Sequence, residues 1–321
     1  MITCLPRLMA AHLLFVTGKG GTGKTTIAMA LARAAAAQGR RVALVEVDNQ
    51  RPSLTEHFGQ APAYHPVNVG PNLWIGNVTW DEALEEWLGR VVPVPRMTKL
   101  ILGNRMVRLF LEVTPGSREV VTFARLQQLT EAYDLVVVDM PASGHAVSFF
   151  RVFTRASSLF SAGPVRHSLD DALRLLAAPT THLVFASLPE EMVVNETIET
   201  WQRLREGIPS LSMPLVVLNQ GMIPTLSPGE SVLLERLARL DPGPGEEGRR
   251  RAELLRAGRW EAQREQATGE AMERLGQFTT MELLVAPLMG AGGGAADRIR
   301  RMEALLVRSG ALLPGRPGAA A

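Results

Sequence analysis

The sequence predicts an α/β fold in which a doubly wound, mostly parallel sheet is flanked by helices. Short apolar runs alternate along the chain with longer stretches of helical pattern, and a glycine-rich loop joins the first apolar run to the first helical one. Parallel strands buried on both faces read as continuous apolar runs, and they require helical crossovers between them. The alternation therefore favours strands and helices that interleave in one layered sheet.

The glycine-rich loop carries a complete phosphate-binding pattern. The apolar run 13–16 leads into Gly18, four further residues, and Gly23-Lys24-Thr25, and the Ala-rich run 27–38 follows. In a strand-to-helix turn, such glycines let backbone N–H groups surround a phosphate at the positive end of the helix dipole. Lys24 would reach the outer phosphates, and the Thr25 hydroxyl would ligate magnesium. The pattern predicts a P-loop NTPase with a nucleotide-binding set of Gly18, Gly20, Gly21, Thr22, Gly23, Lys24, Thr25 and Thr26.

Six further runs read as strands. They are residues 42–47, 73–78, 134–138, 181–187, 215–218 and 279–285. The run 49–71 between the first two is rich in Pro, Asn, Gln and His and reads as a switch loop with a short helix near residues 54–58. Ligands of parallel sheets gather at the carboxyl ends of the strands, so polar residues there are candidate site residues.

Two acidic residues end predicted strands at that edge. Asp48 follows the strand after the phosphate-loop helix and is the candidate for orienting and activating the attacking water, with a magnesium-water contact or a helix cap as alternatives. Asp139 ends the run 134–138, as does the second magnesium-binding acid of P-loop proteins. Gly144 and His145 follow where a γ-phosphate sensor loop would lie. Asn219, at the end of the run 215–218, is a candidate for the adenine edge, with a turn-forming role as the alternative.

A helical insert is expected at about residues 81–131. Its segment 97–113 contains too many apolar residues for a helix with one wet face, including Met97, Met106 and Phe110. The segment reads as core or dimer interface, or alternatively as an adaptable groove for an apolar client. Residues 1–313 are expected to form a single domain, and 314–321 a disordered tail.

Composition excludes several kinds of protein. The chain has 321 residues, 46% of them hydrophobic, and a net charge of +2, so charge does not imply a nucleic-acid partner. Cys4 is the only cysteine, which excludes internal disulfides and a Cys-x-x-Cys zinc site and suits a cytoplasmic protein. No run approaches the ~18–20 apolar residues of a membrane span.

The loop resembles the deviant Walker A loops of MinD, ParA, nitrogenase iron protein and the ArsA and tail-anchored-protein-targeting (guided entry) ATPases, because Lys19 directly follows Gly18. Other segments are similar to the last of these families. They are Pro115-Gly116-x-x-Glu119, Asp139-Met-Pro-Ala-Ser-Gly-His145, Leu188-Pro-Glu-Glu-Met-Val-Val-Asn-Glu-Thr197, Asn219-Gln220, Trp260 with Gln263, and Ala286-Pro287-Leu288.

The resemblance assigns roles to these positions. It implies that Lys19 crosses a dimer interface to the partner's nucleotide, where such a charge elsewhere contributes about 10³ to 10⁵ in rate; an exposed loop lysine is the alternative. It implies Lys24 and Thr25 as phosphate and magnesium ligands, Asp48 as the hydrolytic switch acid and Asp139 as a magnesium acid acting through water. Asn219 and Pro287 would border adenine.

Departures from the family pattern matter as much. The string after the second strand, Asp48-Asn49-Gln50-Arg51-Pro52-Ser53-Leu54, is one residue longer than the family usually has before the leucine. The arsenite-binding and zinc-binding cysteines of relatives are missing, so neither a metalloid nor a zinc site is expected. With one phosphate loop, the dimer must consist of two chains, identical or related.

The resemblance thus implies a magnesium-dependent ATPase that works as an ATP-driven dimeric switch on a hydrophobic client or membrane-protein partner. An alternative is a MinD- or ParA-like positioning ATPase that binds a membrane or another surface. Its best support is the terminal helical pattern, where Arg298, Arg300, Arg301 and Arg308 accompany Ile299, Met302, Leu305 and Leu306.

Overall fold

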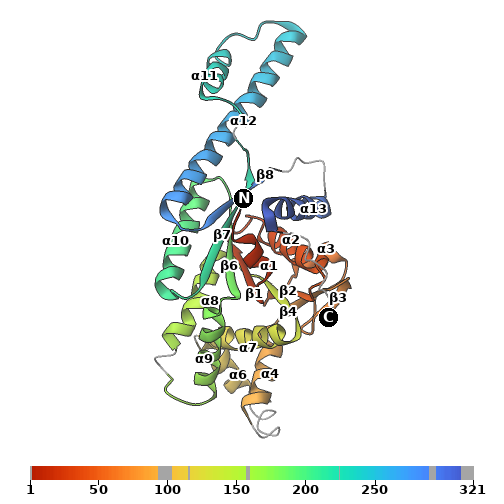
Figure 1. The fold of residues 1–321 in the computed structure, drawn as a ribbon, viewed down its shortest axis with the longest axis vertical. Helices are drawn as coiled ribbons and strands as arrows, with labels where there is room; N and C mark the ends of the chain where they lie inside the picture. The colour runs from red at the N-terminus through yellow and green to blue at the C-terminus, as the bar shows by residue number, and fades with distance from the viewer. Residues whose placement is uncertain are drawn as a thin grey trace, which may run out of the picture.

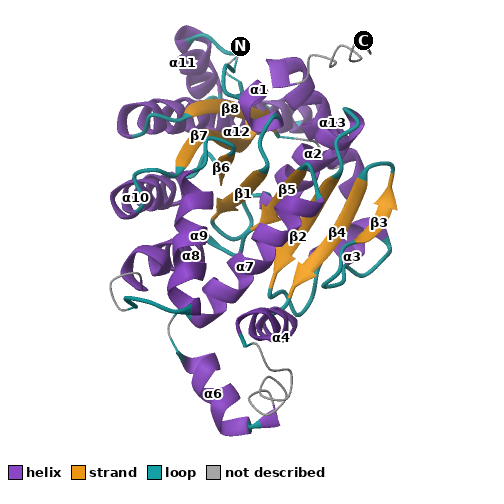
Figure 2. Ribbon diagram, turned by 60° about the horizontal axis from the view of Figure 1, so that its bottom comes forward, coloured by secondary structure: helices purple, strands orange, loops and turns teal. Residues whose placement is uncertain are grey.

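The computed structural model describes residues 2–92, 103–114, 116–156, 160–223, 225–288 and 294–311. Within them, the strands form one eight-stranded sheet (Figure 1), and its order, β3-β4-β2-β5-β1-β6-β7-β8, can be followed in Figure 2. The strands are β1 (Leu13–Gly18), β2 (Val42–Val47), β3 (Val67–Gly70), β4 (Leu73–Val78), β5 (Leu135–Asp139), β6 (Thr181–Ser187), β7 (Ser212–Gly221) and β8 (Glu282–Pro287). Every neighbouring pair is parallel except β3 and β4. The predicted α/β fold with a mostly parallel sheet is confirmed.

Two details of the strand prediction were wrong. Strand β3 lies inside the segment 49–71, which the sequence assigns to a loop. It is four residues long, partly exposed and antiparallel at the sheet edge, so it lacks the apolar run of a buried strand. The last strand begins at Glu282 instead of residue 279, because helix α12 (Gly245–Phe278) continues to that point and the Thr279 hydroxyl bonds back to the Leu275 carbonyl (2.7 Å).

Helices cover both faces of the sheet, because alternate residues of each central strand enter two different cores. Leu14 and Val16 of β1 face one core, and Leu13 and Phe15 face the other. The first core lies under α1 (Leu5–Met9), α2 (Lys24–Ala37), α3 (Ser53–Phe58) and α13 (Ala295–Leu306). The second lies under α4 (Trp80–Val91), α7 (Ser117–Ala132), α8 (Ser143–Ala156), α9 (Pro164–Ala177), α10 (Glu191–Gly207) and α12.

Aromatic side chains fasten the helical region to the strand that leads into the phosphate loop. The Phe15 ring of β1 meets the Phe150 ring of α8 edge-on, with centroids 5.0 Å apart, and the Phe123 ring of α7 lies 4.9 Å from that of Phe153. Such pairs contribute about 0.5–1.5 kcal/mol beyond area burial. Helices α7 and α8 are thereby packed directly behind the phosphate-loop strand.

Three helices differ in how much apolar surface they expose or bury. Figure 2 shows α6 (Arg105–Val113) standing apart from the sheet, with Met106 72% and Phe110 67% exposed. Helix α11 (Pro228–Leu237) and the adjoining part of α12 project from the opposite end of the molecule (Figure 1). The last helix, α13, packs against α2 and buries Ile299, Met302 and Leu306, and a π-helical turn (Val307–Ala311) follows it.

Some sequence-based expectations fall outside the described residues. The proposed disordered tail, 314–321, lies there, as does the part of the apolar segment between residues 97 and 102. In the part of the chain that the structure describes, no helix has both the length and the apolar character needed to cross a membrane.

Candidate functional site

The phosphate loop occupies the turn between β1 and α2, where two glycines allow close approach of neighbouring strands. At Gly18 (φ 153°), an added Cβ would lie 2.2 Å from the Ala186 carbonyl oxygen of β6. At Gly23 (φ 87°), it would lie 2.3 Å from the Asn219 side-chain nitrogen. Larger residues at either position would therefore clash with β6 or β7, besides straining the backbone. The loop is fixed in place by its neighbours in the sheet.

Two backbone carbonyls of the phosphate loop accept hydrogen bonds from nearby side chains. The Thr22 hydroxyl and the Lys24 ammonium both donate to the Lys19 carbonyl, at 2.8 and 3.2 Å. The Asn219 amide donates to the Thr22 carbonyl at 2.9 Å. Helix α2 starts at Lys24 with Gly23 as its N-cap, and no side chain caps it. The positive end of a 14-residue helix therefore faces the loop, as an anion-binding turn requires.

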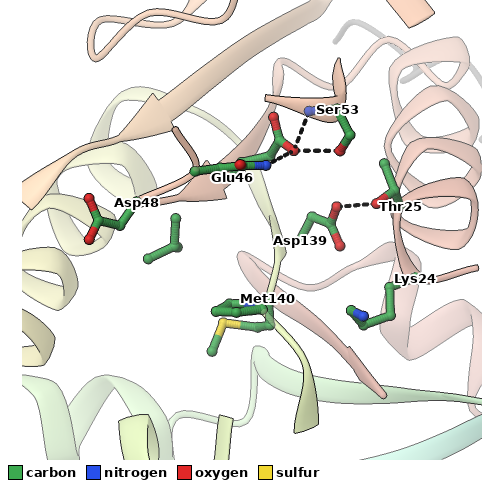
Figure 3. Close-up of a pocket in the computed structure, with 10 residues that line it drawn as sticks. Lys24, Thr25, Glu46, Asp48, Ser53, Asp139 and Met140 are labelled. Atoms are coloured by element: carbon green, nitrogen blue, oxygen red, sulfur yellow. Dashed lines mark hydrogen bonds between the residues drawn. The ribbon is translucent and has the colours of Figure 1, made fainter. Parts of the chain in front are cut away.

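The Thr25 and Asp139 side chains meet beside the loop. The Thr25 hydroxyl donates to Asp139 Oδ2 at 2.5 Å, and Figure 3 shows the two side chains facing each other with Lys24 nearby. The register that sets Asp139 beside Val16 of β1 and Glu46 of β2 creates this arrangement. The other carboxylate oxygen, Oδ1, is buried and has no hydrogen-bond partner among the described residues.

Electrostatics distinguish this cluster from an ordinary surface. Burial raises the pKa of Asp139 to about 6; the Thr25 hydrogen bond and the Lys24 charge act against that rise, and Glu46 adds to it. Burial also lowers the pKa of Lys24, while the charges of Asp139 and Glu196 oppose the shift. A buried carboxylate with an unpartnered oxygen beside a threonine hydroxyl fits a hard divalent cation, which prefers oxygen ligands. The residues present therefore fit Mg²⁺.

Asp48 lines the same cavity as Lys24, Thr25 and Asp139, but its carboxylate points in another direction. The cavity has a volume of about 310 Å³ and is lined by Lys24, Thr25, Glu46, Asp48, Asp139 and other residues. Asp48 has a φ of 46°, a conformation that residues other than glycine seldom adopt. Its carboxylate points away from Asp139, Thr25 and Lys24 (Figure 3). The structure brings Asp48 to the site's rim without directing its oxygens at the phosphate loop.

Arg118 holds the Asp48 carboxylate in that direction. Its Nη1 donates to Asp48 Oδ2 at 2.8 Å, and its Nη2 donates to Glu112 Oε1 of α6 at 2.7 Å. The guanidinium also lies over the Trp80 ring, 5.5 Å from the centroid. The sequence reasoning used Pro115, Gly116 and Glu119 of this segment and missed Arg118; nothing in the local pattern shows that its side chain reaches the end of β2.

Glu46 is a second residue that sequence reasoning missed. This buried carboxylate accepts hydrogen bonds from the Asn49 amide (2.9 Å), the Ser53 backbone amide (3.0 Å) and the Ser53 hydroxyl (2.6 Å). It therefore fastens the loop after Asp48 to the strand that carries Asp48. Its signal was present in the sequence, since Glu46 is the only charged residue within the apolar run 42–47.

The remaining candidates lie around the same edge of the sheet. Asn219 contacts the phosphate loop, and Pro287 at the end of β8 pairs with Gly221, two residues after Asn219. Gly144 lies in the first turn of α8, just after Pro141, which lines the cavity; the backbone of His145 is in the same turn. Thr26 is in the first turn of α2, and Gly20 and Gly21 are exposed in the loop. These positions thus lie at or after the carboxyl ends of β1, β5, β7 and β8.

Lys19 points to a residue of its own chain. Its ammonium nitrogen lies 3.4 Å from Glu196 Oε2 of α10, and both side chains are a little over one third exposed. Glu196 belongs to the sequence segment 188–197 already singled out. Exposed ion pairs of this kind contribute about 0–1 kcal/mol, so the contact holds Lys19 only weakly.

Comparison with known proteins adds an independent observation. A family model described as anion-transporting ATPase matches residues 11–169. The ATPase BagA of Mycobacterium tuberculosis is 30% identical over 268 residues, covering 78% of this chain and 76% of its own. The chain belongs to the ArsA family of ATPases. It is therefore an enzyme that uses a nucleotide and hydrolyses ATP, in agreement with the prediction from the phosphate loop.

Two further relatives of this ArsA-family ATPase match a smaller share of the chain. A putative arsenical pump-driving ATPase 2 of Aquifex aeolicus is 30% identical over 147 residues, covering 43% of this chain and 48% of its own. An ATPase ASNA1 homolog of Babesia bovis is 31% identical over 142 residues, covering 43% of this chain and 37% of its own. The resemblance to the ArsA and targeting branch is thus confirmed at the level of the family.

Proposed function

We propose that this ArsA-family ATPase is magnesium-dependent and couples ATP hydrolysis to a conformational switch in a dimer that acts on an apolar client. The observation that carries the proposal is the buried Thr25–Asp139 pair beside Lys24, with one Asp139 oxygen unpartnered among the described residues. Thr25 would bind Mg²⁺ directly and Asp139 through water. The ion would neutralise charge that develops on the phosphates during transfer.

The chain's own residues supply binding and orientation. The amides of the phosphate loop and the start of α2 would hold the β- and γ-phosphates, with the Lys24 ammonium beside them. Asp48 would orient and activate the attacking water, which requires its carboxylate to turn from its present direction toward the phosphates. Asn219, which contacts the phosphate loop, and Pro287, which pairs with Gly221, would border the adenine, and Gly144 and His145 would respond to the γ-phosphate.

Dimerisation would complete the site. Lys19 would leave its weak contact with Glu196 and reach the nucleotide of a second chain, either identical or related. Since the ion pair is exposed, exchanging it for a phosphate contact in a closed dimer is energetically accessible. ATP would then favour the closed dimer through its differential affinity for that state, and hydrolysis would release it.

An apolar surface supports the client. A cavity of about 290 Å³ lies between α4, α6, α7 and α9, and its lining is almost entirely apolar. Its residues include Leu84, Trp87, Phe110, Leu111, Val120, Val121, Ala156 and Val165. Together with the exposed side chains of Met106, Leu109 and Phe110 on α6, it offers an apolar face on the helical side of the protein. Such a face suits a hydrophobic segment of a partner protein better than a metalloid.

The alternative, a MinD- or ParA-like positioning ATPase, depended on the terminal helix as a membrane surface. In the structure, that helix turns Ile299, Met302 and Leu306 toward α2 and the core. Its apolar side is therefore engaged within the protein, and no observation favours the alternative over a client-binding switch.

Three measurements test the proposal. Steady-state ATP hydrolysis should require Mg²⁺. The rate of hydrolysis should fall in Asp48→Asn without loss of nucleotide binding. It should also fall in Lys19→Ala, whose monomers should still bind ATP. Turnover of either variant near that of the wild type would contradict its assigned role.

The protein should retain a hydrophobic tail peptide only when ATP is present, and the double variant Met106→Ser/Phe110→Ser should retain less of it. Unfolding of that double variant would instead identify the segment as core.

A further inference from the structure

We propose that Arg118 is a positioning residue that sets the direction of the Asp48 carboxylate and makes it depend on helix α6. The inference rests on the proposed role of Asp48 in orienting the attacking water. It assigns a restraining function to a side chain that touches neither the phosphate loop nor the Thr25–Asp139 pair. Through it, the apolar face around α6 would regulate the rate of ATP hydrolysis.

Both Asp48 oxygens are engaged on the side away from the phosphates. The Trp80 backbone amide at the start of α4 approaches Oδ1 at 3.4 Å, and Arg118 donates to Oδ2 at 2.8 Å. The second contact is the stronger, since it joins opposite charges at a short distance. For the carboxylate to turn toward the site shown in Figure 3, the Arg118 contact must break. Arg118 therefore restrains the residue that hydrolysis requires.

The same guanidinium reaches α6 with its other nitrogen. Nη2 donates to Glu112 Oε1 at 2.7 Å, so one planar group joins the end of β2 to the last turn of α6. The Ser117 hydroxyl, one residue before Arg118, also donates to the Leu111 carbonyl of α6 at 2.5 Å. The position of Arg118 is consequently tied to that of α6 through both its side chain and its neighbour.

The apolar cavity lies against this link. Phe110, Leu111, Gly116 and Ser117 line it, which places the end of α6 and the start of α7 on its wall. Gly116 itself sits close to Val152 of α8, where an added Cβ would lie 2.8 Å from Cγ1, so the turn before Arg118 has little room to shift toward α8. An apolar group that enters the cavity would displace α6, and Arg118, tied to α6 through Glu112 and through the Ser117–Leu111 contact, would be drawn away from Asp48. Release of Asp48 would follow.

Arginine suits this task because two divergent contacts are needed. A guanidinium presents fixed donors in a plane and can serve two carboxylates at once, whereas a lysine ammonium acts as a single point charge. Both ion pairs are nearly half exposed, so each is weak enough to break during turnover. A buried pair at this position would lock Asp48 instead of regulating it.

Steady-state kinetics of the full chain at saturating ATP and Mg²⁺ test the proposal. Arg118→Ala should raise kcat about twofold to fivefold, the range expected for loss of an exposed restraining ion pair, with an unchanged KM for ATP. The kcat of Arg118→Lys should fall between those of the wild type and Arg118→Ala. Glu112→Gln should lower kcat in the wild type, because Arg118 then pairs with the Asp48 carboxylate alone, and should have no further effect in the Arg118→Ala background. Arg259→Ala, which removes a similarly exposed pair between α12 and Glu235 of α11, serves as the control and should leave kcat unchanged.

Several outcomes would overturn the inference. A lower or unchanged kcat in Arg118→Ala would show that Arg118 assists Asp48 or has no influence on it, and independent, additive effects of Arg118→Ala and Glu112→Gln would break the link to α6. If Arg118→Ala fails to fold, the kcat values of Arg118→Lys and Glu112→Gln decide the question. Asp48→Asn separates the two hypotheses: if it hydrolyses ATP normally, the proposed role of Asp48 fails, whatever Arg118 does.

Discussion

The two halves of the candidate site are held by different kinds of contact. Lys24 and Thr25 begin α2, and Asp139 ends β5, a buried strand whose register is set by its parallel neighbours β1 and β2. Asp48 ends β2, but exposed side chains from α6 and α7 determine where its carboxylate points. The first half is built into the sheet, whereas the second is held by side chains of helices outside the sheet. This division suits an enzyme that binds nucleotide on a rigid cradle and regulates the hydrolytic step separately.

The largest effect should come from the rigid half. Lys24→Ala should reduce kcat/KM for ATP by at least about 100-fold, since it removes the charge that we propose to hold the phosphates. Isothermal titration with ATP should show weakened binding as well, in contrast to Asp48→Asn. Arg33→Ala, an exposed change on the same helix, is the matched control. Comparable binding by Lys24→Ala and the wild type would show that the comparison places the phosphate contacts on the wrong residue.

A pH-dependent stability should mark the rigid half as well. The pKa of Asp139 rises to about 6 on folding from about 4, so the folded state favours the protonated acid. Without Mg²⁺, the free energy of unfolding should therefore fall by about 3 kcal/mol as pH increases from 4 through 6, and stay low above it. Urea unfolding at several pH values measures this change.

Asp139→Asn provides the control for that experiment, because its amide does not titrate. The step between pH 4 and 6 should disappear in the variant, leaving the contributions of other groups. Added Mg²⁺ should stabilise the wild type more at pH 7.5 than at pH 5, where the acid is protonated. An identical pH profile in wild type and variant would place the titrating group elsewhere.

The boundary between the halves is Glu46, and its removal should have an intermediate effect. Glu46→Gln leaves one carbonyl oxygen for the four donors that surround the carboxylate, so a cost of about 2 kcal/mol is expected. Since the Glu46 charge also raises the pKa of Asp139, the pH-dependent step should move to lower pH. Glu56→Gln, an exposed change on α3, is the control. A shift in neither quantity would show that Glu46 does not connect the two halves.

The two halves of the site also differ in how much of each the sequence predicts. The phosphate loop and the strand ending in Asp139 depend on local spacing and on apolar runs, both of which are visible in the sequence. The roles of Arg118 and Glu112 depend on side chains that meet across 70 and 6 residues, for which no local pattern exists. Strand β3 was missed because a short, half-exposed edge strand lacks the buried run. Glu46 was visible as a charge in an apolar run but not interpreted.

The smallest effect should be on stability in the movable half. Arg118→Ala removes two ion pairs whose side chains are all between 42% and 45% exposed, so the free energy of unfolding should change by less than about 1 kcal/mol. Urea unfolding at low and moderate salt measures the loss, which should shrink further as salt screens the charges. A loss of unfolding free energy as large as that expected for Glu46→Gln would mean that Arg118 mainly stabilises the fold. Stability near that of the wild type together with altered turnover would instead fit a residue whose contacts form and break during the catalytic cycle.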